Sequence, residues 1–422
     1  MTHSGTASLP LSGVRVVELT HMVMGPTCGM ILADLGADVI NVEPPGGDNT
    51  RRLIGAGAGF FAMFNRNKRS LAVDLADPRG RALVVKLAAG ADVFSENFRP
   101  GAMAKLGLDA QSLQAANPGL VYVSHKGFLP GPYEHRTALD EVVQMMGGLA
   151  YMTGPEGRPL RAGSSVNDIM GGMFGAIGAL AALEERRRTG RGRRVESALF
   201  ENSVLLVAQH MLQTALTGAP APPMPSRISA WAVYDVFTVR DGTQIFLAVV
   251  SDTQWAAFCR AFGYDDLAAD GRLATNNDRV RARDWLMPLL RERLGTLPAD
   301  EIAGRFEAHG LPCAPITRPD QLFDDPHLRA TGGLAPVRVP ADASSAGRAV
   351  DTRAPLLPLA LDGARLPLRS PPPAVGEHGA AILRELGYST AEIAALVADG
   401  VIAIPSPGDG ARAGHDSTGR RG

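Results

Sequence analysis

The chain has 422 residues, which is long enough for two domains because domains usually contain about 100–200 residues. Its formal net charge of −1 gives no reason to expect a nucleic-acid or membrane partner, and no uncharged apolar run reaches the ~20 residues of a membrane span. The N-terminus lacks the features of a signal peptide, and Cys28, Cys259 and Cys313 are too far apart to favour a disulfide framework or a metal site, so we expect a cytoplasmic protein without a bound metal.

The first third of the chain alternates between strand-like and helix-like segments. Short apolar runs predict strands at Val14–Leu19, Asp38–Val42, Ser70–Asp74, Asp92–Glu96 and Leu120–Ser124. The intervening segments predict helices at Gly25–Leu35, Pro78–Ala89 and Pro100–Leu106. This alternation predicts an α/β fold with a parallel sheet. Ligands of such sheets bind beyond the carboxyl ends of the strands, which directs attention to the loops after Leu19, Val42 and Glu96.

A smaller domain is predicted in the middle of the chain. The proline-rich segment Gly218–Pro225 predicts a stiff linker. After it, Asp241-Gly242 lies between two strand-like runs, Ala232–Val239 and Thr243–Val250, and predicts a β-hairpin. Helices are expected at Thr253–Phe262, Ala282–Leu294 and Ala299–His309, and later at Ala380–Leu386 and Thr390–Asp399. We therefore expect a large domain over residues 1–217, a small α+β domain over 226–325, and a disordered tail over 405–422, which is rich in Gly, Ser and Arg.

Asp168 precedes a helix-like run of small residues, Ile169–Leu183, that contains four glycines. Glycine destabilises a helix by about 0.5–1 kcal/mol relative to alanine, so these glycines indicate that another backbone or a ligand lies very close. A carboxylate at a helix start faces backbone N–H groups and the positive end of the helix dipole, which favours its ionised, nucleophilic form. The spacing from Ser165 to Asp168 also fits a capping box. Local sequence leaves open whether Asp168 is a nucleophile or a cap.

Cations gather near the ends of two predicted strands. Asn65–Ser70 places three cations before one strand, Arg99 follows another strand, and Lys105 lies in the next helix. Clustered cations at strand ends suit a polyphosphate, although a solvated basic face is the simpler interpretation of any single one. His21, His125 and His135 have no metal-ligand spacing, and Gly55–Gly59 lacks the spacing of a dinucleotide-binding loop.

Several motifs, taken in order along the chain, resemble those of the class III CoA-transferases, the group of the formyl-CoA and carnitine CoA-transferases. The resembling segments are Pro10–Leu19, Gly25-Pro26, Leu35–Glu43, Asn65–Ser70, Glu96–Gly101, Thr189–Gly192 and Gly376–His378. The resemblance implies that Asp168 is the nucleophile, which forms an aspartyl-CoA thioester while CoA passes from an acyl-CoA donor to a free carboxylic acid. Small residues after Asp168 and backbone N–H groups at the helix start are expected to accommodate the anionic intermediates. CoA is then a substrate, and no permanently bound cofactor is expected.

The resemblance also implies CoA contacts and an overall architecture. The expected CoA contacts are Val23, Met24, Val73, Ala76, Asn97, Phe98, Arg99 and Lys105. Formyl-CoA transferases have a glutamine at Val23 and an arginine at Pro44, so we do not expect the acceptor to be bound as oxalate is. A small dicarboxylate is one candidate acceptor, with His135 or Arg136 as hypothetical partners of its distal carboxylate. The implied fold is a Rossmann-like large domain built from both chain ends, to which residues 326–404 return, and two subunits that interlock as a homodimer.

Two alternatives to a transferase are considered. The α-methylacyl-CoA racemases of the same superfamily use an aspartate and a histidine as acid and base. The aspartate matches Asp168, but the histidine falls at Leu139, which cannot transfer a proton, so racemisation is disfavoured. A non-catalytic CoA-binding protein of the same fold is the second alternative, and it would bind CoA without turning over a donor and an acceptor.

Overall fold

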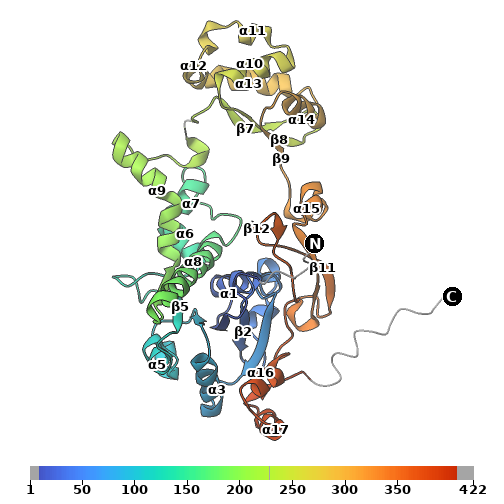
Figure 1. The fold of residues 1–422 in the computed structure, drawn as a ribbon. Helices are drawn as coiled ribbons and strands as arrows, with labels where there is room; N and C mark the ends of the chain where they lie inside the picture. The colour runs from blue at the N-terminus through green and yellow to red at the C-terminus, as the bar shows by residue number, and fades with distance from the viewer. Residues whose placement is uncertain (1–8, 228, 406–422) are drawn as a thin grey trace, which may run out of the picture. The chain divides into compact units, whose positions relative to one another are not determined.

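A seven-stranded sheet organises the larger of two units in this computed structural model, which describes residues 9–227 and 229–405 (Figure 1). The strands follow the order β14-β3-β2-β1-β4-β5-β6, and only the short edge strand β14 is antiparallel to its neighbour. Their bounds are β1 Arg15–Leu19, β2 Asp38–Glu43, β3 Lys68–Val73, β4 Val93–Glu96, β5 Val121–Lys126, β6 Arg194–Ala198 and β14 Ile402–Ala403. The prediction of an α/β fold with a mainly parallel sheet is confirmed.

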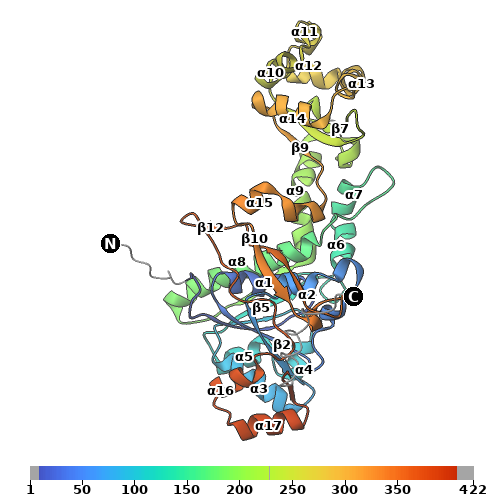
Figure 2. The same ribbon diagram turned by 90° about the vertical axis from the view of Figure 1, so that its right-hand side faces the viewer.

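Helices cover both faces of this sheet. Val17 and Ile40 lie in a core shared with α3, α5, α16 and α17, whereas Val16 and Val39, one residue earlier in each strand, lie in a core shared with α1 and α8 (Figure 2). This arrangement follows from the two-residue period of a strand, which sends successive side chains to opposite faces. The helices of the larger unit are α1 Met24–Asp34, α2 Phe60–Phe64, α3 Pro78–Ala89, α4 Ala102–Leu106, α5 Ala110–Ala116, α6 Asp140–Met146, α7 Leu149–Thr153, α8 Val166–Thr189, α9 Leu199–Thr217, α15 Pro326–Ala330, α16 Gly379–Glu385 and α17 Thr390–Ala398.

The helix α8 contains the glycine-rich run predicted from the sequence. In the described part of the chain, it is the one helix that is long and apolar enough to cross a membrane by length and composition. Its small residues, such as Ala176 and Ala179, are buried against α1 and the sheet, as in a core helix. The apolar character of α8 is therefore used in packing within this unit.

The second unit comprises residues 224–325 and has its own hydrophobic core. Its antiparallel sheet has the order β7-β8-β9, with bounds β7 Val233–Thr238, β8 Gln244–Val249 and β9 Cys313–Pro315. Its helices are α10 Asp252–Phe262, α11 Asp265–Ala268, α12 Asn276–Arg281, α13 Arg283–Leu294 and α14 Ala299–Ala308. The predicted hairpin joins β7 to β8: Asp241 Oδ1 accepts a hydrogen bond from the Thr243 N–H at 3.0 Å, and Gly242 has a φ of +79° that suits glycine.

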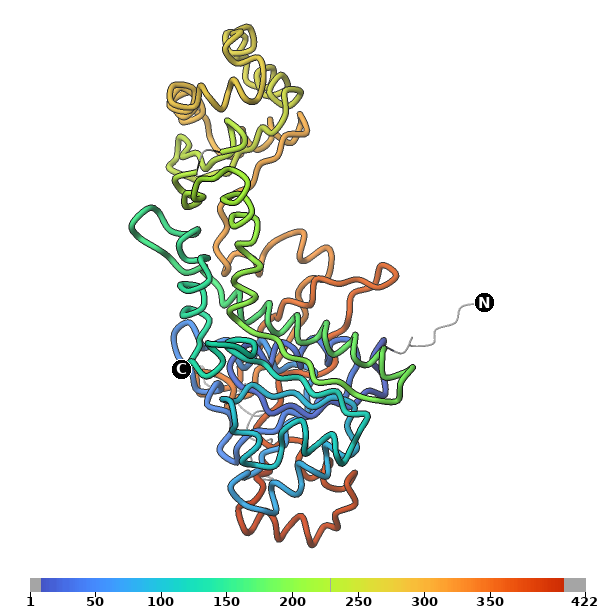
Figure 3. The backbone as a smooth tube through the Cα atoms, turned by 90° about the vertical axis from the view of Figure 1, so that its left-hand side faces the viewer, coloured from blue at the N-terminus to red at the C-terminus, as the bar shows by residue number. Residues whose placement is uncertain are grey.

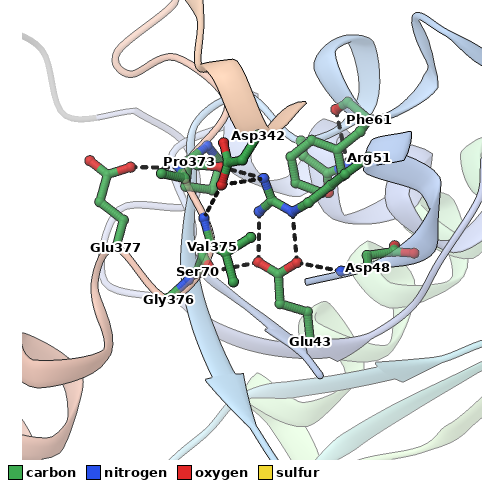
Figure 4. Close-up of polar contacts among 12 residues, drawn as sticks. Glu43, Asp48, Arg51, Phe61, Ser70, Asp342, Pro373, Val375, Gly376 and Glu377 are labelled. Carbon is green, nitrogen blue, oxygen red and sulfur yellow. Dashed lines mark hydrogen bonds and ion pairs between the residues drawn. The ribbon is translucent and has the colours of Figure 1, made fainter. Parts of the chain in front are cut away.

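The segment after Pro326 packs against the N-terminal half of the larger unit (Figure 3). It contains the antiparallel pair β10 Leu334–Val339 and β11 Val350–Pro355 and the short pair β12 Ala360–Leu361 and β13 Ala364–Arg365. Figure 4 shows one attachment: Arg51 is paired with Glu43 at 2.6 Å and donates to the Pro373 carbonyl at 3.0 Å. Ser70 Oγ donates to the same carboxylate and accepts from the Gly376 N–H at 2.8 Å. Residues 406–422, which make up most of the predicted disordered tail, lie outside the described residues.

Candidate functional site

The loops after β1 and β4 meet where the strand order of the sheet reverses. From β1, the sheet continues on one side through β2 and β3 and on the other through β4, β5 and β6. The Asn97 side chain joins the two loops, because its Nδ2 donates to the His21 carbonyl at 2.8 Å and its Oδ1 accepts from the His21 N–H at 3.1 Å. The Phe98 ring packs edge-on against the His21 ring, with 5.5 Å between centroids. Open α/β sheets bind ligands at such a reversal, so this geometry favours a ligand site here.

A cleft of about 790 Å³ opens beside these loops. Five of the residues predicted from the sequence line it, namely Asn97, Phe98, Arg99, His135 and Arg136. His135 is 83% exposed at its side chain and lies 3.2 Å from the neighbouring Glu134 carboxylate. Arg136 stacks on the Tyr133 ring, with its guanidinium carbon 4.1 Å from the ring centroid. The structure thus brings these predicted residues together from two loops.

The cleft contains a further cation, Lys126, which the sequence analysis missed. Lys126 ends β5, and its Nζ donates to Glu96 Oε1 at 2.8 Å and to the Phe98 carbonyl at 3.2 Å. The signal that could have identified it is its place at the carboxyl end of a strand, as for Arg99. Arginine and lysine side chains grouped in this way suit the phosphates of a polyanionic ligand. His125, the preceding residue, is fully buried with a pKa lowered to about 3 by desolvation, which is consistent with a structural role.

The first turn of α8 is capped by Asp140 rather than by a capping box. Ser165 makes no side-chain cap hydrogen bond, which contradicts that interpretation of the sequence. Asp140 Oδ2 accepts from the N–H groups of Asn167 at 2.9 Å and Asp168 at 3.1 Å. The N–H of Ile169 donates to the carbonyl oxygen of Ser165. The expectation of free backbone donors for anionic intermediates is therefore wrong for these N–H groups, because a carboxylate and a carbonyl already occupy them.

The Asp168 carboxylate is half-buried and has no hydrogen-bond partner among the described residues. Burial is the main cause that raises its pKa to about 7, and the negative charges of Asp140 and Glu141 raise it further, whereas Arg161 lowers it. The expectation that this carboxylate is fully ionised is therefore wrong near neutral pH, because burial and like charges outweigh the helix dipole. A carboxylate with a pKa close to the working pH can act as a nucleophile or exchange a proton.

The glycines of α8 allow a close approach of α1 and β5. A Cβ atom at Gly172 would lie 2.5 Å from the Met24 carbonyl oxygen, and one at Gly175 would lie 2.4 Å from the His125 ring. Real Cβ atoms essentially never make contacts this short, so a larger residue at either position would force its neighbours to shift. The prediction that another backbone lies very close to this helix is confirmed.

A second hollow, of about 440 Å³, lies at the start of α8. Val23, Ser165 and Ile169 are part of its wall, so it reaches the turn of helix that carries Asp168. Val23 is one of the predicted contacts, and it ends the loop after β1. The loops after β1 and before α8 therefore meet around this hollow.

The remaining predicted contacts lie elsewhere in the larger unit. Met24 is 5% exposed and packs under Gly171 of α8. Val73 is 1% exposed inside β3, Ala76 follows that strand with its N–H bound to Asp74, and Lys105 is exposed on α4. None of these four residues is part of the wall of either hollow described above.

In the described residues, no group of three or more His, Cys, Asp or Glu side chains is arranged to hold a metal ion.

The cations of Asn65–Ser70 form ion pairs with partners distant in the sequence. The pairs are Arg66 with Asp34 at 2.6 Å, Lys68 with Glu18 at 2.6 Å, and Arg69 with Asp38 at 3.2 Å and Glu385 at 2.5 Å. Arg66 and Lys68 are each 1% exposed. Both interpretations of this motif, a polyphosphate site and a solvated basic face, are wrong, because acidic groups of the same chain neutralise these cations.

Comparison with known proteins identifies relatives over most of the chain. The family model described as CoA-transferase family III matches residues 11–379. The chain is 36% identical to an acyl-CoA transferase of Fusarium pseudograminearum over 409 residues, covering 93% of this chain and 88% of that one. It is 35% identical to a succinate–glutarate CoA-transferase of Agrobacterium fabrum, covering 92% and 98%. Among solved structures, a CAIB/BAIF family protein from Brucella suis superposes with a TM-score of 0.79 at 36% identity, covering 90% of this chain and all of that one.

Proposed function

The chain belongs to CoA-transferase family III, and we propose that it moves CoA from an acyl-CoA donor to a free carboxylic acid through a thioester on Asp168. One observation carries this proposal. The carboxylate of Asp168 has no hydrogen-bond partner among the described residues, while its backbone N–H is fixed by Asp140. Its neighbours Ser165 and Ile169, at the start of α8, line a hollow large enough for an acyl group. A structural carboxylate in such a position is expected to be paired, whereas a nucleophile must be free to attack.

The transfer proceeds in covalent steps at the Asp168 carboxylate. An Asp168 oxygen attacks the thioester carbonyl of the donor, the C–S bond breaks, and a mixed anhydride and the CoA thiolate result. The thiolate then attacks the Asp168 carbonyl carbon, the donor leaves as a carboxylate, and an aspartyl-CoA thioester remains. The acceptor carboxylate attacks this thioester, the C–S bond breaks, and a second mixed anhydride and the CoA thiolate form. The thiolate then attacks the acceptor's acyl carbon, which gives the acceptor-CoA thioester and releases the Asp168 carboxylate. In each step a nucleophile replaces a leaving group at a carbonyl carbon, so no redox step is needed.

The cleft at the strand-order reversal is proposed to hold the CoA moiety. Asn97 and Phe98 fix the loop geometry there, and Arg99 supplies positive charge for phosphates. Lys126 lies in the same cleft, paired with Glu96. The other expected contacts, Val23, Met24, Val73, Ala76 and Lys105, remain part of this proposal on the strength of the family resemblance.

We propose a small dicarboxylate as the acceptor. The Agrobacterium relative is named for transfer between succinate and glutarate, and the chain spans nearly all of it.

The proposed transfer of CoA requires no metal or redox cofactor. We place the enzyme in the cytoplasm, in agreement with its three unpaired cysteines.

A homodimer is also proposed, in the interlocked form that the family resemblance implies. Three neighbouring helices, α6, α8 and α9, expose large apolar side chains. These are Val142, Met145, Met146, Met173, Phe174, Ile177, Leu205, Leu206, Met211, Leu212 and Leu216. Apolar surface of this extent on adjacent elements is typical of a protein–protein interface, and a second copy of the chain is the partner we propose. Sedimentation of the purified protein tests this, and a monomer at micromolar concentration contradicts it.

Trapping the covalent intermediate tests the role of Asp168. The protein is incubated with succinyl-CoA, treated with hydroxylamine or borohydride, digested and analysed by mass spectrometry. We expect modification of the peptide that contains Asp168, and no modification of that peptide in Asp168→Asn. An unmodified peptide during turnover of several donors contradicts the proposal. Exchange of the α-hydrogen of a branched acyl-CoA with deuterium oxide, without an acceptor acid, would instead indicate the racemase that Leu139 disfavours.

A further inference from the structure

The hollow at the start of α8 has one apolar and one polar side. Phe60, Phe64, Val23 and Ile169 form the apolar side, and they also pack together in one cluster. The polar side is the loop from Arg161 to Ser165. Such a hollow suits a molecule with an aliphatic chain and one polar or charged end.

Among the described residues, Arg161 is the only ionisable side chain in the wall of this hollow. Its Nη1 is paired with Glu141, its Nε donates to the Ala162 carbonyl at 3.0 Å, and its Nη2 lies 3.9 Å from Asp140 Oδ1. The last distance is too long for a hydrogen bond, so Nη2 still has donors to offer. The side chain is 37% exposed, and a ligand in the hollow can therefore reach it.

Asp140 contacts both Arg161 and the backbone of Asp168. One oxygen of Asp140 faces Arg161, and the other holds the N–H of Asp168 at 3.1 Å. No ion pair joins the guanidinium to the Asp168 carboxylate among the described residues, although its positive charge lowers the pKa of Asp168. A cation in that place is suited to the distant end of an acyl chain whose other end reacts at Asp168.

We propose that Arg161 determines specificity by binding the distal carboxylate of a dicarboxylic acceptor, whose methylene chain lies against Phe60, Phe64 and Ile169. This inference rests on the proposed CoA transfer and assigns the acceptor's second charge to the hollow at α8. It replaces His135 and Arg136 in that role, because they line the cleft assigned to CoA. The guanidinium presents its free Nη2 donors to the carboxylate while Nη1 stays paired with Glu141.

The test compares two acceptors of the same chain length, glutarate and pentanoate, with succinyl-CoA as donor. In a reaction through a covalent CoA intermediate, kcat/KM for the acceptor reports on its own half-reaction. We expect the wild type to prefer glutarate. Arg161→Gln is expected to lower kcat/KM for glutarate by about 10- to 100-fold, mainly through KM, and to leave pentanoate unchanged within about twofold. Arg161→Lys keeps the charge without the fork and is expected to retain part of the preference.

Arg158→Gln is the matched control, because Arg158 lies in the same loop, is exposed and is not part of the wall of the hollow. It is expected to leave both acceptors unchanged. An equal loss for glutarate and pentanoate in Arg161→Gln overturns the proposal and indicates that Arg161 acts through Asp140 and Asp168. A wild type without preference, or a variant without loss, overturns it as well. Failure of the wild type to transfer CoA to any acid refutes the proposed function itself, and the inference falls with it.

Discussion

Replacing Asp168 by asparagine is predicted to stabilise the larger unit at neutral and alkaline pH while abolishing CoA transfer. Asparagine has the same shape but no charge, so it removes the burial of a charge and the repulsion from Asp140 and Glu141 that raise the pKa of Asp168 to about 7. At a pH well below 3.8, the ordinary pKa of an aspartate side chain, the carboxyl group is protonated in both the folded and the unfolded chain. As the pH rises from there to about 7, the unfolded chain ionises and the folded chain does not, so the wild type loses stability. Above pH 7 the loss is complete.

The size of this effect follows from the pKa shift. Each pKa unit corresponds to about 1.36 kcal/mol, so a shift from 3.8 to about 7 sets a ceiling of about 4 kcal/mol. Asp168 keeps part of its surface in water, where solvent screens the neighbouring charges. We therefore expect Asp168→Asn to raise the free energy of unfolding by about 2 kcal/mol at pH 8 and to lose most of this gain at pH 4.

The assay must report on the larger unit separately from the other one. Tryptophan fluorescence does not, because all three tryptophans, Trp231, Trp255 and Trp285, lie in the other unit. Methionine oxidation by peroxide across a urea series meets this need, since a buried methionine reacts only when its surroundings unfold. Met30 in α1 and Met287 in α13 are each 3% exposed and report on the larger and smaller unit. The predicted gain affects Met30 and leaves Met287 unchanged. Equal stability of variant and wild type at Met30 at pH 8, or a gain that is the same at pH 4 and pH 8, refutes the reasoning.

Three further predictions concern activity and packing. kcat/KM for the acyl-CoA donor is expected to rise about tenfold per pH unit up to about pH 7 and then level off, because Asp168 must be ionised to attack; a profile that is flat from pH 5 to 8 contradicts this. Gly172→Ala is expected to destabilise the larger unit by about 1–3 kcal/mol, because the added methyl group overlaps with α1. Gly304 lies on a helix of the other unit, and a methyl group added there would have no atom within 4 Å, so Gly304→Ala is expected to stabilise that unit by about 0.5–1 kcal/mol. The oxidation assay measures both changes. Asn97→Ala removes both hydrogen bonds to His21 and is expected to raise KM for the donor about tenfold with little change in kcat, as steady-state kinetics would measure.

The elements with strong local signals could be predicted from the sequence. The helix Pro78–Ala89 was predicted with the bounds that α3 has. In the structure Asp77 caps it and a proline begins it, so its start is marked by local residues. The β7–β8 hairpin was predicted from its turn residues. The strand β6 was not predicted, because it is short and begins at the end of a strongly basic run that is typical of a loop. It is a strand because it pairs with β5, a partner that is distant in the sequence.

The site was predicted less completely, because its charges are set by residues far apart in the chain. Nothing local to Asn65–Ser70 indicates that Lys68 lies against Glu18 in the core. Likewise, Asp140 caps α8 from a position 28 residues before Asp168, so the local Ser165 spacing was misleading. The position of Asp168 at a glycine-rich helix start could be recognised, but the pKa of its carboxyl group could not, because that depends on burial and on neighbours brought in by the fold.

The raised pKa of Asp168 is consistent with a compromise between stability and reactivity. A more basic carboxylate is a stronger nucleophile once it is ionised, so the like charges of Asp140 and Glu141 favour attack on a thioester. Burial of the carboxylate and these charges together destabilise the folded chain as the pH rises above 4, by about 2 kcal/mol at pH 8. Close packing of α8 on α1 through its glycines offsets this cost, since burial of the helix does not depend on pH. If Arg161 binds the acceptor's distal carboxylate, its favourable effect on the Asp168 charge weakens when the acceptor enters, and by then Asp168 is held as a neutral thioester. The cation is therefore available to the substrate at the step in which the nucleophile no longer needs it.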